Sequence, residues 1–222
     1  MIPQIRLGNS ALILDPWAIG RRKPPPQETW SPYVGSRDKQ NPNPNKWARA
    51  KMRRDNKRMN LMALAALGIV KSDHVLEIGY GSGEALTLAA HMANKGFAAG
   101  IDRSMDMLQD AFKRAKRSRA KNVSVLRGDA SWLPWSACSF DKVFCVDGVT
   151  DWPCTRSALE EAFRVLRPGG TLLIVEPIGK KLTKSKALAL SHLLTVVGFE
   201  DLQVSMTRDG RHEVILIRAI RL

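Results

Sequence analysis

A glycine-rich loop directly after an apolar run carries the strongest chemical signal in this sequence. Residues 75–84 read VLEIGYGSGE, with Glu77 inside the run and glycines at positions 79, 81 and 83. Glycines at this spacing let the chain turn tightly and let a ligand lie against the backbone. A helix that starts after them offers free N–H groups and the positive end of its dipole to an anion. The loop therefore predicts a site for a ligand that presents both a cationic and an anionic group.

The loop does not carry the dinucleotide fingerprint. That fingerprint, GxGxxG, needs a third glycine at the position that Glu84 occupies here. Glu84 would also repel a pyrophosphate bound at the start of the helix. S-adenosylmethionine fits better, because its ammonium group can meet Glu77 and its carboxylate can meet backbone N–H groups. We therefore expect S-adenosylmethionine as the cofactor and S-adenosylhomocysteine as the product.

Two aspartates follow at the ends of the next two apolar runs. Asp102 ends FAAGID, 19 residues after Gly83, where a carboxylate can hold both ribose hydroxyls. Asp129 lies in RGDA, where a carboxylate can accept a hydrogen bond from the adenine amino group. Each aspartate alone is also compatible with turn or N-cap chemistry. Acidic residues at three successive strand ends nevertheless favour a ligand that contains adenosine.

Strand and helix patterns alternate along the part of the chain that must position these residues. The expected strands are 74–79, 97–102, 123–128, 140–147 and 170–177. The expected helices are 84–95, 104–119, 155–166 and 184–197. Such alternation is typical of a parallel sheet with helices on both faces. Residues 199–206 and 212–220 read instead as two strands joined by an Asp-Gly turn, so the sheet should end in an antiparallel pair.

The N-terminal region does not follow this alternation. Residues 20–45 are rich in proline and polar side chains, and we expect residues 1–45 to form an extended, proline-rich basic arm. Asn45 can cap a helix over 46–67, which Gly68 ends. One side of that helix carries methionine and alanine at helical spacing, and the other side carries Lys and Arg. The domain that holds the loop is therefore expected to span 46–222.

The net charge of +14 is distributed unevenly. Residues 1–60 hold 13 Lys/Arg against 4 Asp/Glu, so most of the excess lies in the N-terminal region. A basic region of this kind can meet nucleic acid, anionic lipid or an acidic substrate, and it can also be a solvated face.

Composition disfavours several other classes of protein. The longest apolar run, residues 61–70, is too short for a bilayer, which needs about 20 residues. Three cysteines without a CxxC pair and four scattered histidines give neither a disulfide framework nor a metal-ligand spacing. No signal peptide is recognisable. We expect a cytoplasmic protein without a bound metal, with peripheral attachment to an anionic membrane surface left open.

Taken together, these motifs resemble the class I S-adenosylmethionine-dependent methyltransferases. The similarity is greatest to the small-molecule branch that includes ubiquinone/menaquinone-type enzymes. It covers roughly residues 60–220 and is carried by VLEIGYGSGE, GIDRSMDMLQDA, GDASWLPWSACSFDKVF, the turn around DGVTDW, and RVLRPGG followed by TLLIVEP. The resemblance implies an α/β fold with a Rossmann-like, doubly wound, seven-stranded sheet whose last strand is antiparallel, preceded here by a basic N-terminal extension.

The resemblance also implies roles for individual residues. The glycine loop would hold the methionine moiety, Asp102 the ribose, and Asp129 with the Ala130 backbone the adenine. Tyr80 would either close over the methionine end or pack in the core. The full set implied to contact the cofactor is Glu77, Gly79, Tyr80, Gly81, Ser82, Gly83, Asp102, Arg103, Met105, Asp129, Ala130, Asp147 and Gly148.

The segment after the fourth strand departs from the family pattern. Family members often have Asn or a similar residue there, followed by a His-Trp-like pair, whereas residues 147–152 read DGVTDW. The catalytic candidates are Asp147, Asp151 and Trp152, with His91 and His192 as further candidates for a base. Each of them also has a structural alternative, and a base is needed only if the nucleophile must lose a proton.

These features predict an enzyme that transfers a methyl group to a small-molecule or lipid-like acceptor by in-line displacement. Residues 178–186, where many relatives place a substrate lid, are few, so we expect the segment 47–60 to lie near the opening of the site instead. The alternative is an RNA or other nucleic-acid methyltransferase that uses the basic N-terminal extension. Nucleic acid is the less favoured partner, because the Asn/Asp-Pro-Pro-aromatic stretch of base-amino methylating enzymes is absent after the fourth strand. The sequence specifies neither the acceptor atom nor an oligomeric state.

Overall fold

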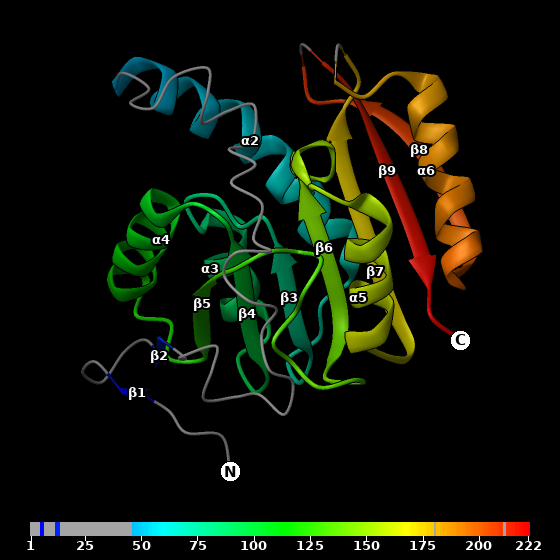
Figure 1. Cartoon of the computed structure of the whole chain (residues 1–222). Coiled ribbons are helices and arrows are strands. Elements are labelled where there is room, and N and C mark those ends of the chain that lie inside the picture. Colours follow the sequence, from blue (N-terminus) through cyan, green and yellow to red (C-terminus); the bar gives the residue numbers. More distant parts are fainter. Residues whose placement is uncertain (1–4, 7–11, 14–45, 180, 211) are drawn as a thin grey trace.

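The structure, a computed structural model, places a β-sheet between two layers of helices (Figure 1). It describes residues 5–6, 12–13, 46–179, 181–210 and 212–222, with the side chains described from residue 56 onward. The expected arm at 1–45 therefore lies outside the described residues, apart from two short strands. The side chain of Trp47, expected near the opening of the site, also lies outside them.

Seven strands form the main part of the sheet. They are β3 (His74–Ile78), β4 (Phe97–Asp102), β5 (Val123–Arg127), β6 (Phe140–Val146), β7 (Leu166–Pro177), β8 (Glu200–Arg208) and β9 (Glu213–Ile220). Their order is β5-β4-β3-β6-β7-β9-β8, and β9 runs antiparallel to both of its neighbours. This arrangement confirms the predicted doubly wound, Rossmann-like sheet with an antiparallel last strand.

Two details of the sheet differ from the sequence-based expectation. Strands β1 (Ile5–Arg6) and β2 (Leu12–Ile13) extend the sheet beyond β5, although the sequence there predicts an extended arm. Strand β7 begins at Leu166 rather than at residue 170. Between the pairs Phe140–Leu166 and Lys142–Thr171, β7 contains more residues than β6, so the turn-forming LRPGG segment forms an irregularity within β7.

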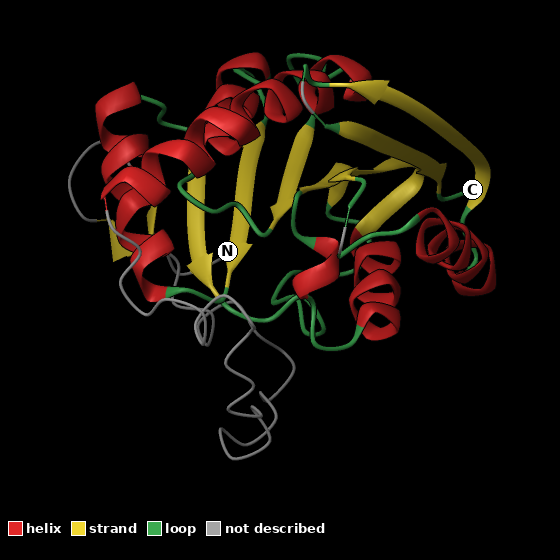
Figure 2. Cartoon of the chain, turned by 90° about the horizontal axis from the view of Figure 1, so that it is seen from above, coloured by secondary structure: helices red, strands yellow, loops and turns green. Residues whose placement is uncertain are grey.

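Helices cover the sheet on both faces, as Figure 2 shows from above. On one face lie α2 (Lys46–Leu67), α3 (Glu84–Met92) and α4 (Met105–Ser118). On the other lie α5 (Thr155–Val165) and α6 (Lys184–Val197), with a short 3₁₀ turn, η2 (Val149–Asp151), after β6. Figure 1 shows the first half of α2 projecting beyond the ends of the strands. No helix in the described part of the chain is long and apolar enough to cross a membrane.

The central strands are buried on both sides, which explains their nearly continuous apolar sequences. In β3, β6 and β7 the side chains of Leu76, Phe144 and Ile174 are fully buried. Two carboxylates, Glu77 in β3 and Glu176 in β7, interrupt these apolar runs although they are 2% and 1% exposed. Burying a carboxylate is costly unless it has partners, so these two positions call for a functional explanation.

Candidate active site

Five acidic residues gather near the carboxyl ends of the parallel strands, an edge that we call the carboxyl edge. Glu77, Asp102 and Glu176 lie in the last residues of β3, β4 and β7, while Asp129 and Asp147 follow β5 and β6. In an open α/β sheet this edge is where ligands bind, near the point at which the strand order reverses. Here the order reverses between β3 and β6. The topology therefore brings together carboxylates that are separated by up to about one hundred residues in sequence.

The glycine loop between β3 and α3 has the backbone conformation that only glycine adopts readily. Gly79, Gly81 and Gly83 have φ angles of 81°, 53° and 74°. A Cβ atom added at Gly79 or Gly81 would meet no other atom within 4 Å, so open space lies beside this stretch of backbone. At Gly83, in contrast, a Cβ atom would lie 2.8 Å from the Cβ of Ala111 in α4. The first two glycines thus leave room for a ligand, and the third permits close helix packing.

The N–H groups of these glycines make hydrogen bonds within the chain. Gly79 N–H donates to the Ile101 carbonyl at 2.8 Å, Gly81 N–H to Asp102 Oδ2 at 2.9 Å, and Gly83 N–H to the Tyr80 carbonyl at 2.8 Å. The sequence predicted that the helix after the loop would offer free N–H groups and that the backbone of the three glycines would hold the methionine moiety, and both remain predictions. Of the three glycine donors, only Gly83 N–H closes a turn of the loop itself. The loop offers a ligand its shape and the open space beside Gly79 and Gly81.

Glu77 is the best-defined acceptor for a cationic group. It is 2% exposed, and its Oε2 atom has no hydrogen-bond partner among the described residues. Burial, followed by the nearby Asp102 carboxylate, raises the pKa of Glu77 well above its ordinary value. A buried carboxylate with an unpaired oxygen is costly in the ligand-free protein. An ammonium group at this position would satisfy that oxygen and favour the charged form of Glu77, which is the fit expected for the amino-acid end of S-adenosylmethionine.

Asp102 is held in a fixed orientation by backbone donors. Its Oδ2 accepts the Gly81 N–H at 2.9 Å, and its Oδ1 accepts the Ser104 N–H at 2.9 Å. The second contact stands at the start of α4, where Ser104 is the N-cap residue. Each carboxylate oxygen can accept more than one hydrogen bond. Asp102 therefore joins the glycine loop to α4 and retains acceptor capacity for a pair of ribose hydroxyls.

The residues expected around the adenine also lie together. Arg103 Nε is 3.4 Å from Asp129 Oδ2, and Asp129 Oδ1 accepts the Ser131 N–H at 2.8 Å. Ala130, between them, is buried, and Met105 at the start of α4 is 47% exposed. Arg103, which follows β4, thus lies beside Asp129, which follows β5. This is the arrangement expected of residues that contact an adenine ring from two sides.

Tyr80 and Ser82 occupy different environments within the loop. The Tyr80 side chain is 3% exposed, and its hydroxyl donates to the Leu126 carbonyl at 3.0 Å. Burial and the charges of Asp102 and Glu77 raise the pKa of Tyr80. This arrangement favours the packing alternative for the Tyr80 side chain, since it fastens the loop onto β5. The Ser82 carbonyl accepts a hydrogen bond from Arg114 Nε at 3.0 Å and so faces α4.

The loop after β6 has a strained start. Asp147 adopts φ of 50°, an uncommon value for a residue with a side chain, and its N–H donates to the Val175 carbonyl at 2.8 Å. Asp151 pairs with Lys181 at 2.7 Å. Trp152 packs against the main core cluster, and its buried Nε1–H has no acceptor among the described residues. Strain and an unsatisfied donor in one short loop next to the carboxyl edge are typical of a functional site.

Glu176 is a buried carboxylate beside the candidate site that the sequence analysis did not identify. Its Oε1 accepts N–H groups from Gly148 at 2.6 Å and from Val149 at 2.5 Å. Burial, followed by the charge of Asp147, raises the pKa of Glu176 to about 8. Glu176 thus holds the loop that carries Asp147, Asp151 and Trp152. Its only signal in the sequence is an acidic residue at the end of the apolar run LLIVE.

The two histidines considered as bases do not lie at the carboxyl edge. His91 is exposed near the end of α3, and His192 is exposed on α6, on the other face of the sheet. Asp147 and Asp151 are the candidate groups that the fold does place there. Within the described ranges, no three His, Cys, Asp or Glu side chains are arranged to hold a metal ion.

Three features together define the class of protein. They are the strand order, the open space beside the glycine loop, and a Glu77 oxygen that has no partner among the described residues. A seven-stranded sheet with an antiparallel last strand and this carboxyl edge is that of a class I S-adenosylmethionine-dependent methyltransferase. The family model of the methyltransferase domain matches residues 69–203, more than half of the chain. The chain belongs to this family, as the sequence motifs predicted, and it is an enzyme that uses S-adenosylmethionine.

Two curated relatives and one solved structure illustrate the similarity. The uncharacterized methyltransferase YdaC of Bacillus subtilis is 29% identical over 158 residues, covering 69% of this chain and 86% of that protein. The ubiquinone/menaquinone biosynthesis C-methyltransferase UbiE of Nitrobacter hamburgensis is 38% identical over 104 residues, covering 46% of this chain and 41% of that protein. A methyltransferase structure from Aquifex aeolicus superposes with a TM-score of 0.64 at 21% identity, covering 84% of this chain and 98% of that one.

Proposed function

We propose that this enzyme methylates a small, lipophilic acceptor that carries an oxygen, such as a quinol-like ring. The observation that carries the proposal is the buried Nε1–H of Trp152, which has no acceptor among the described residues and lies in the loop after β6. An aromatic wall with one unsatisfied donor suits an apolar ring with an oxygen substituent. Relatives that bear quinone-methyltransferase names support the same class of acceptor.

The cofactor would be held by residues of the carboxyl edge. Glu77 would accept the ammonium group, Asp102 the ribose hydroxyls, and Asp129 the adenine amino group. S-adenosylmethionine supplies a methyl group on a sulfonium, which is already activated for displacement. The protein must therefore align the acceptor and exclude water, and alignment alone can contribute about 7–11 kcal/mol. Asp147 and Gly148 would line the reacting end of the site.

A general base is needed only for an acceptor that must lose its proton. Asp147 and Asp151 are the carboxylates of the loop after β6, and Asp151 is already paired with Lys181. We take Asp147 as the first candidate to remove a proton from a hydroxyl or an acidic carbon, because it directly follows the end of β6. Trp152 would hold the acceptor oxygen and wall the pocket.

Helix α2 would form the cover of the site, and residues 46–222 would constitute the catalytic domain. Asn60 Nδ2 lies 3.5 Å from Glu84 Oε2 at the start of α3, and Arg58 Nη1 donates to the Asp209 carbonyl in the β8–β9 turn. These contacts fasten α2 beside the glycine loop. Figure 1 shows its first half continuing past the carboxyl edge, where a cover would lie.

Two experiments, performed one after the other, test the proposed function. Isothermal titration calorimetry should show binding of S-adenosylmethionine and no binding of NAD. Release of S-adenosylhomocysteine should then be measured with quinol, phospholipid, small-metabolite and RNA pools as acceptors. Turnover confined to the quinol pool would support the proposed acceptor, whereas turnover confined to the RNA pool would replace it with the nucleic-acid alternative.

The nucleic-acid alternative rests on the charge of the N-terminal region. Charge alone gives binding to phosphate backbones without base selection. A cytoplasmic enzyme that attaches peripherally to an anionic membrane surface would use the same basic region. Cosedimentation with RNA and with anionic liposomes over a series of salt concentrations separates these partners, because each has its own salt dependence.

A further inference from the structure

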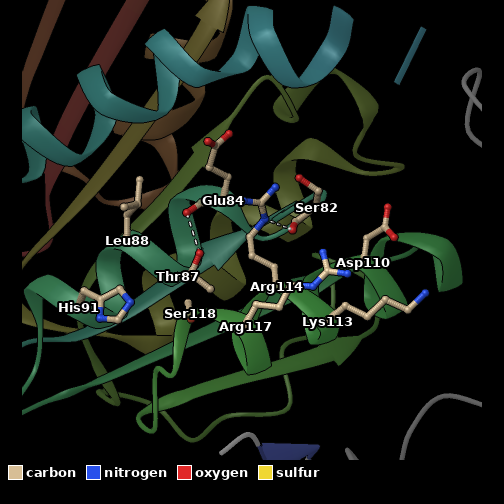
Figure 3. A pocket seen from close by; sticks show the side chains of 10 residues that line it. All are labelled: Ser82, Glu84, Thr87, Leu88, His91, Asp110, Lys113, Arg114, Arg117 and Ser118. Carbon is tan, nitrogen blue, oxygen red and sulfur yellow. Dashed lines mark hydrogen bonds between the residues drawn. The ribbon is translucent and has the colours of Figure 1, made fainter. Parts of the chain in front are cut away.

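A groove between α3 and α4 adjoins the site described above and shares Ser82 with it. It encloses about 610 Å³ and is lined by the ten side chains labelled in Figure 3. Ser82 and Glu84 connect it to the outer side of the glycine loop, but its lining includes none of the acidic residues assigned to the cofactor. Pockets for small ligands typically enclose about 300–1,000 Å³. The groove therefore has the size of a second ligand site.

Three cations from one helix dominate this groove. Lys113, Arg114 and Arg117 project from α4 into it, as Figure 3 shows. Arg114 and Arg117 are one turn apart, and Lys113 and Arg117 are separated by four residues, so all three lie on one side of the helix. Like charges at this spacing repel one another and destabilise the helix. An anion bound between them would relieve that repulsion.

The three cations also retain donors for a ligand. Arg114 donates through Nε to the Ser82 carbonyl at 3.0 Å, which orients the guanidinium and leaves its Nη groups for another partner. Lys113 and Arg117 make no hydrogen bond or ion pair to the part of the chain that the structure describes. A group with several oxygens, such as a phosphate, matches such a set of donors. Arg frequently binds phosphate through two parallel hydrogen bonds, that is, in a bidentate manner.

The other lining side chains restrict the kind of phosphate. Glu84 and Asp110 place carboxylates in the groove, so a ligand with hydroxyl donors beside its phosphate would fit better than a bare anion. Leu88 adds an apolar contact and is 37% exposed. The volume also exceeds what a single phosphate fills. The chemistry therefore indicates a phosphate ester of a small polyol.

We propose that the α3–α4 groove binds a polyol phosphate ester through Lys113, Arg114 and Arg117, at a site separate from the site of methyl transfer. The same chemistry is presented by a soluble ester and by a phospholipid headgroup. In either case the ligand would lie directly behind the glycine loop, because Arg114 holds the Ser82 carbonyl of that loop.

Glycerol 3-phosphate is the soluble probe, and calorimetry of the full chain at constant ionic strength is the measurement. The test variant is Lys113→Gln with Arg117→Gln. The control is Lys116→Gln with Lys121→Gln, which removes the same two charges from exposed positions on and after α4 that do not line the groove. We expect the Kd to rise by about 10-fold or more in the test variant, because two charged donors are lost, and to stay unchanged in the control.

Vesicles of phosphatidylcholine with and without phosphatidylglycerol distinguish the two sources of the ligand. Cosedimentation that needs phosphatidylglycerol and is lost only in the test variant would assign the groove to a lipid headgroup. Saturable binding of glycerol 3-phosphate without such cosedimentation would assign it to a soluble ester. The proposal is overturned if the full chain binds neither probe, or if test and control variants weaken binding equally, because the second result would show general charge attraction.

Discussion

Asp102 is the residue on which we expect cofactor binding to depend most directly. It accepts N–H groups from both the glycine loop and the start of α4, so its position is fixed before any ligand arrives. A carboxylate that is already oriented loses little conformational entropy when it binds a pair of hydroxyls. Charged hydrogen bonds are also roughly twice as strong as neutral ones. Its charge should therefore matter for affinity, independently of its shape.

Replacing Asp102 by Asn should separate the contribution of its charge to cofactor affinity from the contribution of its side-chain shape. Asn keeps one carbonyl oxygen as an acceptor but lacks the negative charge and the second acceptor oxygen. We expect the Kd for S-adenosylmethionine to rise by about 10-fold or more, equivalent to at least about 1.4 kcal/mol, measured by calorimetry. Glu160→Gln, an exposed substitution on α5 at the other face, is the control and should leave the Kd unchanged. An unchanged Kd in Asp102→Asn would remove this residue from the cofactor site.

Glu176 acts on the site through the backbone. One oxygen accepts two N–H groups of the loop after β6, and that loop carries Asp147, Asp151 and Trp152. Without this acceptor two donors of a mostly buried turn would lose their partner, and such donors cost about 1–3 kcal/mol each. Gln retains the carbonyl oxygen that the loop needs, whereas Ala does not.

The pair Glu176→Ala and Glu176→Gln should therefore differ in activity. We expect the Ala variant to lose about 2–4 kcal/mol of stability in urea unfolding and to show a higher KM for the acceptor. The Gln variant should restore most of the stability and the KM, because it can still accept both N–H groups. Equal loss in the two variants would show that the charge of Glu176, rather than its acceptor oxygen, matters.

Glu176 should also give stability a distinctive pH dependence. Its pKa is about 8 in the folded protein and has an ordinary value of 4.5, so the folded state binds this proton more tightly than the unfolded state does. The stabilisation is fully present below about pH 4.5 and is lost as pH rises to about 8, at up to about 1.4 kcal/mol per pH unit. Over this window the Tm of the wild type should fall relative to that of Glu176→Gln. Parallel Tm profiles for the two proteins would contradict the raised pKa.

At the scale of elements, the third glycine of the loop sets how closely α3 and α4 pack. Gly83 has positive φ, and a Cβ atom there would lie 2.8 Å from the Ala111 Cβ. Gly68, at the end of α2, also has positive φ but has no atom within 4 Å of the Cβ position. Both glycines therefore adopt a positive φ angle, but only Gly83 lacks space for a Cβ atom.

Substitution by Ala at the two glycines should separate these requirements. Gly68→Ala should lower the free energy of unfolding by about 1–2 kcal/mol, the cost of the left-handed conformation. Gly83→Ala should cost about 1–3 kcal/mol more, because α4 must move to accommodate the methyl group. Urea unfolding gives both values. Equal costs would mean that α3 and α4 separate freely at this point, contrary to their close packing.

At the scale of the whole molecule, the excess of basic residues and the candidate active-site residues lie in different parts of the chain. Residues 61–222 hold 22 Lys/Arg against 17 Asp/Glu, while residues 1–60 hold 13 against 4. The carboxyl edge is acidic, and the basic excess precedes it in sequence and continues into α2, whose later residues contact α3 and the β8–β9 turn. We expect the basic region to act on the acceptor and not on the cofactor.

Deletion of residues 1–45 tests whether the basic region acts on the methyl acceptor and not on the cofactor. We expect the truncated protein to bind S-adenosylmethionine with an unchanged Kd, because the residues proposed to hold the cofactor lie in 77–148. Its kcat/KM for the methyl acceptor should fall by about 10-fold or more, corresponding to about 1.4 kcal/mol of lost transition-state binding. Unchanged kcat/KM would exclude the N-terminal region from the acceptor site, and weaker cofactor binding would place it at the cofactor instead.

Much of the fold was predictable from the sequence because its signals are local. Apolar runs of strand length, helical periodicity between them and the Asp-Gly turn predicted the helices α2 to α6, the strands β3 to β9 and the antiparallel end of the sheet. The spacing of Glu77, Asp102 and Asp129 relative to those strands indicated the cofactor. The start of β7 was missed because it depends on an irregular stretch of the pairing between β7 and β6. The lengths of individual strands therefore depend on their neighbours.

The sequence by itself determined the class of enzyme and its cofactor, since both depend on residue types at strand ends. Only the tertiary structure decided which donors and acceptors remain available. It engaged the N–H groups of the three loop glycines and left Glu77 Oε2 without a partner in the described part of the chain. It also buried the Tyr80 side chain, whose hydroxyl donates to the Leu126 carbonyl. It also brought Glu176 to the loop after β6, across 28 residues of sequence. Hydrogen-bond partners distant in sequence are set by packing, and no local pattern of residues encodes them.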